Sequence, residues 1–362
     1  MRLLALITDG RGADGGIARF NEDLLQALAS SRHIDHVTAL PRFGNADGWR
    51  DGKIVSLSPI GRSYMWAAKA AYLALTGQFD AIFCGHMNAA PFAAQLARLT
   101  RSKLWVQAYG IDAWPDRGPK FRRALANAEL VTSISRYTQA RLLKWSDIDY
   151  ARARILPVTF NAKFSPQPHR AELAARYGLE GRKTILTVGR LASAETYKGH
   201  DRIIRCMPML QAIVPEAAYL IVGGGDDMPR LKALAQETGL QDSVIFAGRV
   251  PEDELQDHYG ISDVFAMPSD GEGFGIVFLE AAATGIPVVG GNRDGSLDAL
   301  ADGEIGTPVD PHDPRQLTEA LAQAIATPKR ASAEALERFS FPHFAAHVDK
   351  LVSGLVAESS AR

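Results

Sequence analysis

Short apolar runs recur along the whole chain and are separated by turn residues or by segments with helical periodicity. Uninterrupted apolar runs of about four to eight residues are typical of strands that are buried on both faces of a parallel sheet. In the first half they predict strands at Leu3–Thr8, His36–Leu40, Lys53–Leu57, Ala81–Cys84, Lys103–Ala108, Leu130–Ile134 and Ile155–Val158. In the second half they predict strands at Thr184–Val188, Ala218–Val222, Ser243–Ala247, Val264–Met267 and Pro287–Val289.

Helical patterns lie between many of these strands. They include Ile17–Ala29, Ala90–Arg98, Asp201–Ile213, Pro229–Glu237 and Arg315–Ala326. Alternating strands and helices predict an α/β fold with helices on both faces of each parallel sheet. A proline-bearing segment, Phe160–Pro168, precedes a second α/β series. We therefore predict two Rossmann-like domains facing each other across a cleft, at residues 1–164 and 165–340, followed by a long helix at Phe341–Glu358.

Composition and length exclude several classes of protein. The 362 residues suffice for two domains, and 46% apolar with 22% charged residues argues against disorder, collagen and a disulfide scaffold. The two cysteines, Cys84 and Cys206, match no zinc spacing and favour a reducing compartment. The apolar N-terminus is too short for a signal-peptide core, and no run is long enough for a membrane span. We expect a cytoplasmic protein, with attachment to the inner face of a membrane left open.

The net charge of −1 hides an asymmetry. Residues 1–160 hold 21 Lys and Arg against 13 Asp and Glu, whereas the remainder holds 19 against 28. This favours two domains with different partners, although chance surface composition would give the same result. A basic stretch with Arg117 and Lys120, and the aromatic-basic segment Arg62–Trp66, are candidates for contact with an anionic membrane or a phosphorylated acceptor. A solvated helix face is the alternative.

The richest candidate site follows the strand Val264–Met267, since ligands of α/β folds bind at the carboxyl ends of strands. Glycines there let a ligand approach the backbone, and a helix begins near Gly275. The N–H groups of Phe274, Gly275 and Ile276 at this helix start are predicted to form an anion site, with Gly273 beside them as a further ligand-binding residue. Glu280 lies within this apolar helix and needs a partner, either ribose hydroxyls or an arginine. Glu272, eight residues earlier, could face a sugar or be an exposed loop acid.

A second cluster follows the strand Thr184–Val188. Arg190 and Lys198 bracket a loop at its carboxyl end, and two cations beside a helix N-terminus suit a pyrophosphate. Two solvated loop charges are the alternative. After the strand Ser243–Ala247, the backbone near Val250 is placed to meet a nucleobase edge.

The first half contributes a glycine turn and a histidine. Gly10, Gly12 and Gly15 fit G-x-G-x-x-G between a strand and a helix, which permits a dinucleotide site. No acid ends the second strand, so that interpretation would need Arg42 and NADP; alternatively, Gly15 and Gly16 let the backbone approach a phosphate. His86 follows the strand Ala81–Cys84, and either contacts a substrate or is structural. Tyr109 and Asp112 follow the strand Lys103–Ala108, where Asp112 either touches an acceptor or caps a turn.

Together these residues resemble the GT-B family-4 retaining glycosyltransferases. The resemblance rests on Gly189-Arg190-Leu191, Lys198-Gly199 and the E-x7-E element from Glu272 to Glu280, with the Gly15-Gly16 turn and Gly85-His86 in the expected order. It implies transfer of a hexose from a nucleotide sugar, UDP- or GDP-linked, without a metal. The acceptor would be a saccharide or lipid-linked saccharide of surface polysaccharide or glycolipid synthesis.

The resemblance also implies a role for each residue. Arg190 and Lys198 would hold the donor diphosphate, Glu280 the ribose and Glu272 the sugar hydroxyls, with Val250 near the base. Gly16 and the amides of Phe274–Ile276 would line the donor site, and His86 would contact the donor sugar near the reacting carbon. The spacing between Arg190 and Lys198 is unusually long, and the final helix is expected to cross back onto the first domain. Acceptor contacts are expected from Tyr109, Asp112, Arg117 and Lys120.

Two other functions are compatible with parts of the sequence. One is an NAD(P)-dependent oxidoreductase that uses the glycine turn, and the other is a non-catalytic protein that binds sugar nucleotides. Walker A, H-E-x-x-H and G-x-S-x-G motifs are missing from the sequence. The acidic second half argues against a nucleic-acid partner.

Overall fold

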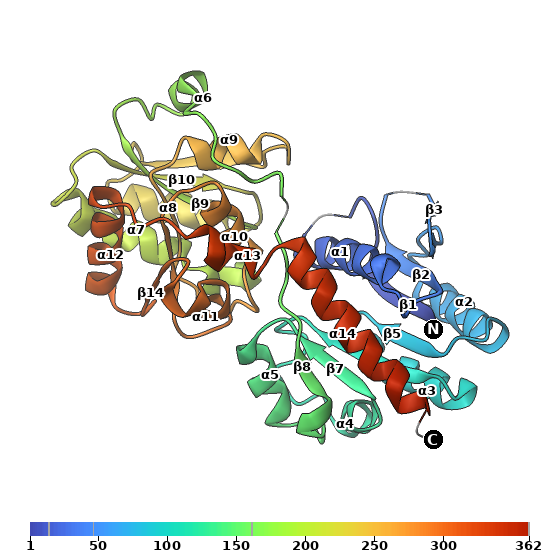
Figure 1. Cartoon of the computed structure of the whole chain (residues 1–362). Helices are drawn as coiled ribbons and strands as arrows, with labels where there is room; N and C mark the ends of the chain where they lie inside the picture. Colours follow the sequence, from blue (N-terminus) through green and yellow to red (C-terminus); the bar gives the residue numbers. More distant parts are fainter. Residues whose placement is uncertain (14, 46, 161, 361–362) are drawn as a thin grey trace. The chain divides into compact units, whose positions relative to one another are not determined.

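The computed structural model describes residues 1–13, 15–45, 47–160 and 162–360 and divides the chain into two compact units, each with its own sheet (Figure 1). Unit 1 comprises Met1–Thr159 and Ser340–Arg362, and unit 2 comprises Phe160–Phe339. The chain enters unit 2 a few residues before the predicted boundary. Phe164 explains the difference, because it is buried and its ring packs edge-on against Tyr259 of unit 2 at 5.8 Å.

Unit 1 is built on an eight-stranded sheet in the order β3-β4-β2-β1-β5-β6-β7-β8. Neighbouring strands are parallel except for the antiparallel pair β3 and β4. The strands are β1 Arg2–Asp9, β2 His36–Phe43, β3 Trp49–Asp51, β4 Ile54–Ser56, β5 Ala81–Cys84, β6 Lys103–Ala108, β7 Leu130–Ser133 and β8 Ala153–Ile155.

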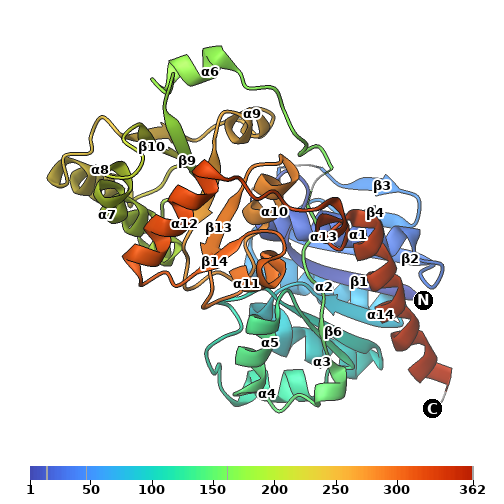
Figure 2. The same cartoon turned by 60° about the vertical axis from the view of Figure 1, so that its left-hand side comes forward.

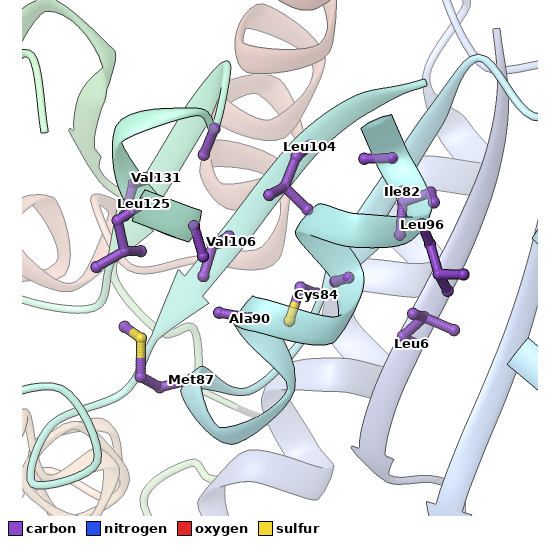
Figure 3. Close-up of a cluster of buried hydrophobic side chains, with 14 of the residues drawn as sticks. Leu6, Ile82, Cys84, Met87, Ala90, Leu96, Leu104, Val106, Leu125 and Val131 are labelled. Atoms are coloured by element: carbon purple, nitrogen blue, oxygen red, sulfur yellow. The ribbon is translucent and has the colours of Figure 1, made fainter. Parts of the chain in front are cut away.

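Helices cover both faces of the unit 1 sheet. They are α1 Gly16–Ser30, α2 Ser63–Thr76, η1 Met87–Ala89, α3 Ala90–Thr100, α4 Pro119–Ala126, α5 Arg136–Leu143, η2 Tyr150–Arg152 and α14 Phe341–Ser360. Side chains alternate across a strand, so Leu4 and Leu6 of β1 point to the face covered by α2, α3 and α4. Figure 3 shows this core, where Leu6, Ile82 and Val106 meet residues of α3 and α4.

The last helix, α14, belongs to unit 1 although it follows unit 2 in the sequence. It lies beside α1 in both views (Figures 1 and 2). Phe344 is buried against the Phe20 ring at 5.7 Å, and Ser31 donates to the Asp349 carboxylate at 2.6 Å. The helix predicted at Phe341–Glu358, which no strand follows, therefore completes the helical layer on one face of the unit 1 sheet.

Unit 2 has a six-stranded, all-parallel sheet in the order β11-β10-β9-β12-β13-β14. Its strands are β9 Lys183–Val188, β10 Ala217–Val222, β11 Val244–Gly248, β12 Val264–Met267, β13 Val288–Gly291 and β14 Thr307–Val309. Its helices are α6 Ala171–Arg176, η3 Ser193–Lys198, α7 His200–Gln211, α8 Met228–Glu237, α9 Leu255–Gly260, α10 Ile276–Ala283, α11 Ser296–Ala299, η4 Ala301–Gly303, α12 Pro314–Ala326 and α13 Ala333–Glu337. One face of the sheet packs on α7, α8 and α12.

Each sheet has a topological switch point, where consecutive connections leave in opposite directions. In unit 1 it lies between β1 and β5, and in unit 2 between β9 and β12. Ligands of open α/β sheets bind outside the carboxyl ends of strands at such points. The glycine turn after β1 and His86 after β5 flank the first switch point. Arg190 after β9 and Glu272 after β12 flank the second.

The α/β fold with two parallel sheets is confirmed, and most strands lie within two residues of their predicted bounds. One predicted strand, Ile155–Val158, has the wrong bounds, because the strand that pairs with β7 is Ala153–Ile155. Pro157 has no N–H to donate, so pairing with β7 ends before it. The helix α2 and the edge strands β3 and β14 were not predicted, since their patterns are short or nearly uniform in polarity.

Within the described residues, none of the helices combines the length and the apolar character that crossing a bilayer requires. Both cysteines, Cys84 and Cys206, are buried free thiols.

Replacing Phe344 with alanine should destabilise unit 1 by about 3 kcal/mol, because it removes a buried aromatic side chain and leaves a cavity. All five tryptophans lie in unit 1, so thermal unfolding followed by tryptophan fluorescence reports on this unit alone. Lys350→Ala, an exposed change on the same helix, is the control and should leave the melting temperature unchanged. Equal melting temperatures for Phe344→Ala and wild type would contradict the docking of α14.

Candidate functional site

Two loops at the switch point of unit 2 bring together four charged side chains. One loop leaves β9 through Gly189 and Arg190 and continues into η3, which ends at Lys198. The other leaves β12 and carries Glu272 to the start of α10. The aliphatic stem of Lys198 passes over Gly189, where an added Cβ would lie 3.6 Å from the lysine Cδ.

The cations and carboxylates of the two loops are paired. The Lys198 ammonium donates to Glu272 Oε2 at 2.9 Å and lies 3.8 Å from Glu195 Oε2. Arg190 pairs with Oε1 of Glu195. The Lys198 and Glu272 side chains are only 13% and 17% exposed, whereas the Arg190 side chain is 74% exposed. The loops therefore form a partly desolvated, charge-balanced cluster.

The Glu272 loop is held from behind by Asp294, which follows β13. The Asp294 carboxylate is buried and accepts hydrogen bonds from the Glu272 amide at 2.6 Å, the Ser269 hydroxyl at 2.8 Å and the Ser296 amide at 2.9 Å. Burial raises the pKa of Asp294 above its ordinary value, and these hydrogen bonds oppose the shift. The Gly295 amide donates to the Glu272 carbonyl at 2.9 Å, so both sides of the Glu272 backbone are fixed.

The start of α10 requires glycine at its cap. Gly275 has a φ of +85°, and a Cβ there would lie 2.6 Å from the Phe278 ring. Gly273 and Phe274 are buried in the preceding turn, and Ile276 is the first helical residue. The first N–H groups of a helix have no partner within it, so this turn presents the positive end of α10.

Glu280 lies one turn into α10 and is half-buried. The Tyr259 hydroxyl donates to Glu280 Oε2 at 3.1 Å. Burial, reinforced by the Glu280 charge, raises the pKa of Tyr259 well above its ordinary value, so the phenol remains a donor. The partner in the structure is thus a tyrosine, which is neither of the two partners expected from the sequence, and the contact of Glu280 with a ribose stays a prediction.

Two more groups shape the neighbourhood of Lys198. The Tyr197 ring packs against Gly271, and burial, with the charges of Glu272 and Glu195, raises the pKa of its phenol. His200, at the first residue of α7, is buried, and burial with the charge of Lys198 lowers its pKa to about 4. At neutral pH this imidazole is uncharged and adds nothing to the cations of the cluster.

Val250 lies two residues beyond β11 and is half-buried. β10 and β9 lie between β11 and the β9–β12 switch point, so Val250 follows a different strand of the same sheet from those that carry the charged cluster. Its predicted contact with a base stays a prediction.

In unit 1, the switch point holds the glycine turn and His86. Gly15 has a φ of +106° and caps α1, and an added Cβ on Gly15 or Gly16 would meet open space. The Asn88 amide donates to His86 Nδ1 at 3.1 Å, which places the proton of the neutral imidazole on Nε2. The role of His86 at the donor sugar stays a prediction.

The predicted acceptor residues differ in their surroundings. Asp112 Oδ1 accepts from the Gly110 amide at 2.8 Å, while Oδ2 is buried without a hydrogen-bond partner. Burial raises the pKa of Asp112, and the nearby His86 opposes the shift. Tyr109 is buried, and its hydroxyl donates to Asn21 at 2.9 Å, which gives it a part in the internal packing of unit 1.

The other two acceptor candidates are on or near α4. Arg117 donates to the Asp112 carbonyl at 3.0 Å and stacks over the Phe121 ring, whereas Lys120 is exposed on α4. The structure thus brings Arg117 to Asp112 and leaves Lys120 on the surface.

Sequence reasoning missed Asp294 and Tyr259, which hold the two glutamates. Asp294 belongs to the polar run 292–294, which follows the predicted strand Pro287–Val289 after two glycines, and that position beyond a carboxyl end could have identified it. Tyr259 lies on the short helix α9, twenty-one residues from Glu280, and no local pattern links them. In the part of the chain that the structure describes, no group of three or more His, Cys, Asp or Glu side chains could hold a metal ion. Metal independence stays a prediction.

Solved structures share the fold over nearly the whole chain. Anabaena HepE in complex with UDP superposes with a TM-score of 0.77 at 18% identity, covering 98% of this chain and 100% of that chain. Sucrose-phosphate synthase from Thermosynechococcus elongatus gives a TM-score of 0.75 at 22% identity, covering 99% and 100%. These similarities show the GT-B fold.

Sequence relatives are closer. A GDP-mannose-dependent alpha-(1-6)-phosphatidylinositol monomannoside mannosyltransferase of Mycobacterium tuberculosis is 35% identical over 355 residues, which is 92% of this chain and 91% of the relative. A protein with the same description from Mycolicibacterium smegmatis is 36% identical over 248 residues, 64% of each chain. Residues 170–339 match the family described as Glycosyl transferases group 1, and the chain belongs to that family.

Proposed function

We propose that this protein transfers a hexosyl residue, with retention of anomeric configuration, from a nucleotide diphosphate sugar to a hydroxyl of a glycolipid acceptor. One observation carries the proposal: Arg190, Lys198 and Glu272 come together at the carboxyl ends of β9 and β12, at the switch point of unit 2, and Glu280 lies on α10, the helix that follows Glu272. Family membership supports glycosyl transfer rather than the NAD(P)-dependent oxidoreductase. A transfer assay distinguishes the proposed enzyme from a non-catalytic protein that binds sugar nucleotides.

Each residue of the site has a defined task in this proposal. Arg190 and Lys198 bind the diphosphate, and the positive end of α10 adds to their field. The Glu280 carboxylate accepts from the ribose hydroxyls while Tyr259 fixes its orientation. Glu272 accepts from hydroxyls of the transferred sugar, and the backbone of residues 273–276 lies against the donor.

Bond cleavage needs charge stabilisation more than a proton donor. As the bond from the anomeric carbon to the phosphate oxygen breaks, negative charge grows on the diphosphate and positive charge on the sugar ring. The two cations and α10 stabilise the diphosphate without a metal. The acceptor hydroxyl attacks from the face that the diphosphate leaves, and a phosphate oxygen takes its proton.

The relatives indicate which substrates to test first. The mycobacterial relatives are named for GDP-mannose and phosphatidylinositol monomannoside, so GDP-mannose and an inositol-containing glycolipid are the first donor and acceptor of this proposal. The relative from Acidothermus cellulolyticus, 32% identical over 253 residues, is named a D-inositol 3-phosphate glycosyltransferase. Asp112 and Arg117 of unit 1 are the proposed acceptor contacts.

A lipid-linked acceptor brings the enzyme to the cytoplasmic face of a membrane, and α2 provides a surface for that contact. Tyr64, Met65, Tyr72 and Leu75 are 68%, 46%, 61% and 63% exposed on this helix. No acidic residue occurs between Asp51 and Asp80, whereas Arg62 and Lys69 lie on or beside α2. Exposed apolar side chains among cations are suited to an anionic bilayer. Trp66, counted in the predicted membrane segment, is buried and donates to the Leu40 carbonyl, so it does not take part.

The direct test of function is a transfer assay. UDP-, GDP- and ADP-hexoses are each incubated with the glycolipid acceptor, with and without EDTA, and the anomeric configuration of the product is read by NMR. Transfer from GDP-mannose with retention, unaffected by EDTA, is the expected result. Binding of sugar nucleotides without transfer to any acceptor would favour the non-catalytic alternative.

Lys198→Met and Glu280→Gln should each weaken binding of the donor nucleoside diphosphate by about 10- to 100-fold, because each removes hydrogen bonds to a charged group. Isothermal titration calorimetry measures the affinity. Lys232→Met, which removes an exposed lysine of α8, is the matched control and should bind like wild type. Wild-type affinity in both site variants would refute the proposed donor site.

Asp294→Asn should lower kcat/KM by about 10- to 100-fold through misplacement of Glu272. Its affinity for the nucleoside diphosphate without sugar should stay within about twofold of wild type, since Arg190 and Glu280 are untouched. The exposed change Asp242→Asn is the control. An equal loss of kcat/KM and of nucleoside diphosphate affinity in Asp294→Asn would show that Asp294 supports the whole unit and does not act by positioning Glu272.

The double variant Tyr72→Ser/Leu75→Ser should lose at least half of its sedimentation with anionic vesicles, because it removes two of the exposed apolar side chains of α2. The matched control is Leu99→Ser/Tyr150→Ser, which removes the same residue types at 71% and 72% exposure elsewhere in unit 1. Unchanged sedimentation of the α2 variant, or equal loss in the control, would contradict a membrane contact through α2.

A further inference from the structure

Glu195 occupies the place between the two cations that the proposed function assigns to the diphosphate. Its Oε1 accepts from Arg190, and its Oε2 lies 3.8 Å from the Lys198 ammonium. The side chain is only 14% exposed, and Oε2 is buried with no hydrogen-bond partner. A buried carboxylate oxygen without a donor is costly, so this carboxylate is held by charge rather than by a complete hydrogen-bond set.

Glu195 lies in the long loop that connects β9 to α7. Within η3, Glu195 departs from helical geometry, with φ −117° and ψ 29°. Gly199 closes the loop with a φ of +80°, where a Cβ would lie 2.4 Å from the Pro268 carbonyl. The unusually long spacing between Arg190 and Lys198 therefore supplies the residue that fills the space between them.

The balance of charges in the cluster places Glu195 in competition with an incoming diphosphate for the two cations. Lys198 also pairs with Glu272, so two cations already face two carboxylates before any ligand arrives. His200 behind Lys198 is uncharged at neutral pH and does not alter the balance. A diphosphate adds at least two negative charges to a partly desolvated site, where repulsion between like charges is weakly screened.

We propose that the Glu195 carboxylate competes with the donor diphosphate for Arg190 and Lys198. The donor displaces it on binding, and its return to the two cations drives release of the nucleoside diphosphate product. This inference rests on the proposed function, in which those cations hold the diphosphate. Glu195 is then a positioning residue that sets product release, without a part in bond cleavage.

The alternative structural role, in which Glu195 only orients Arg190, makes the opposite prediction. Glu195→Gln keeps an oxygen that accepts from Arg190 and removes the charge, whereas Glu195→Ala removes both. A competitor predicts that both variants bind nucleoside diphosphate and inorganic pyrophosphate more tightly, by about 10-fold. An orienting residue predicts unchanged binding for Glu195→Gln and weaker binding for Glu195→Ala.

The experiment measures the affinity of the full-length protein for GDP, UDP, ADP and pyrophosphate by calorimetry, with Glu237→Gln on the exposed end of α8 as the charge-matched control. Steady-state kinetics should show KM and kcat both lowered in Glu195→Gln, as expected when product release slows. Nucleotide affinity that is unchanged or weaker in Glu195→Gln overturns the inference. If wild type binds no nucleotide but pyrophosphate binding tightens in Glu195→Gln, the proposed function fails while the competition between carboxylate and phosphate stands.

Discussion

The ion pair between Lys198 and Glu272 is the interaction on which the rest of the site depends. It joins the loop after β9 to the loop after β12, which leave the unit 2 sheet in opposite directions. Each partner is largely removed from water, and an unpaired charge at such a position would be costly. The pair therefore fixes the two loops against each other.

The surrounding fold is arranged to hold that pair in place. Asp294 and Gly295 fix the backbone of Glu272, and glycines at 271 and 275 let Tyr197 and Phe278 pack where a side chain would clash. Tyr259 orients Glu280 on the neighbouring helix. These contacts are all within unit 2.

Much of this organisation could be predicted from the sequence, because it follows from local patterns. Buried parallel strands are continuous apolar runs, and so the carboxyl ends that carry Arg190 and Glu272 could be placed correctly. Glu280 was noticeable as an acid within an apolar helix. The edge strand β14 has only three residues, and α2 has few polar positions, so neither shows a clear periodic spacing of hydrophobic and polar residues.

The partners of the site residues could not be predicted, since they depend on contacts between distant segments. Tyr259 and Asp294 reach the site from α9 and from the end of β13, and Glu195 was visible only as part of an unusually long loop. The pairing of Arg190 and Lys198 with carboxylates depends on tertiary contacts, so the sequence motif alone did not show that both cations already have acidic partners within the chain.

The most direct measurement is a crystal structure of the protein with a bound nucleoside diphosphate. The two phosphates should lie within hydrogen-bond distance of Arg190 and Lys198, with the ribose hydroxyls at the Glu280 carboxylate. A nucleotide bound elsewhere on the chain, or bound here with Glu280 turned away from the ribose, would contradict the proposed donor site.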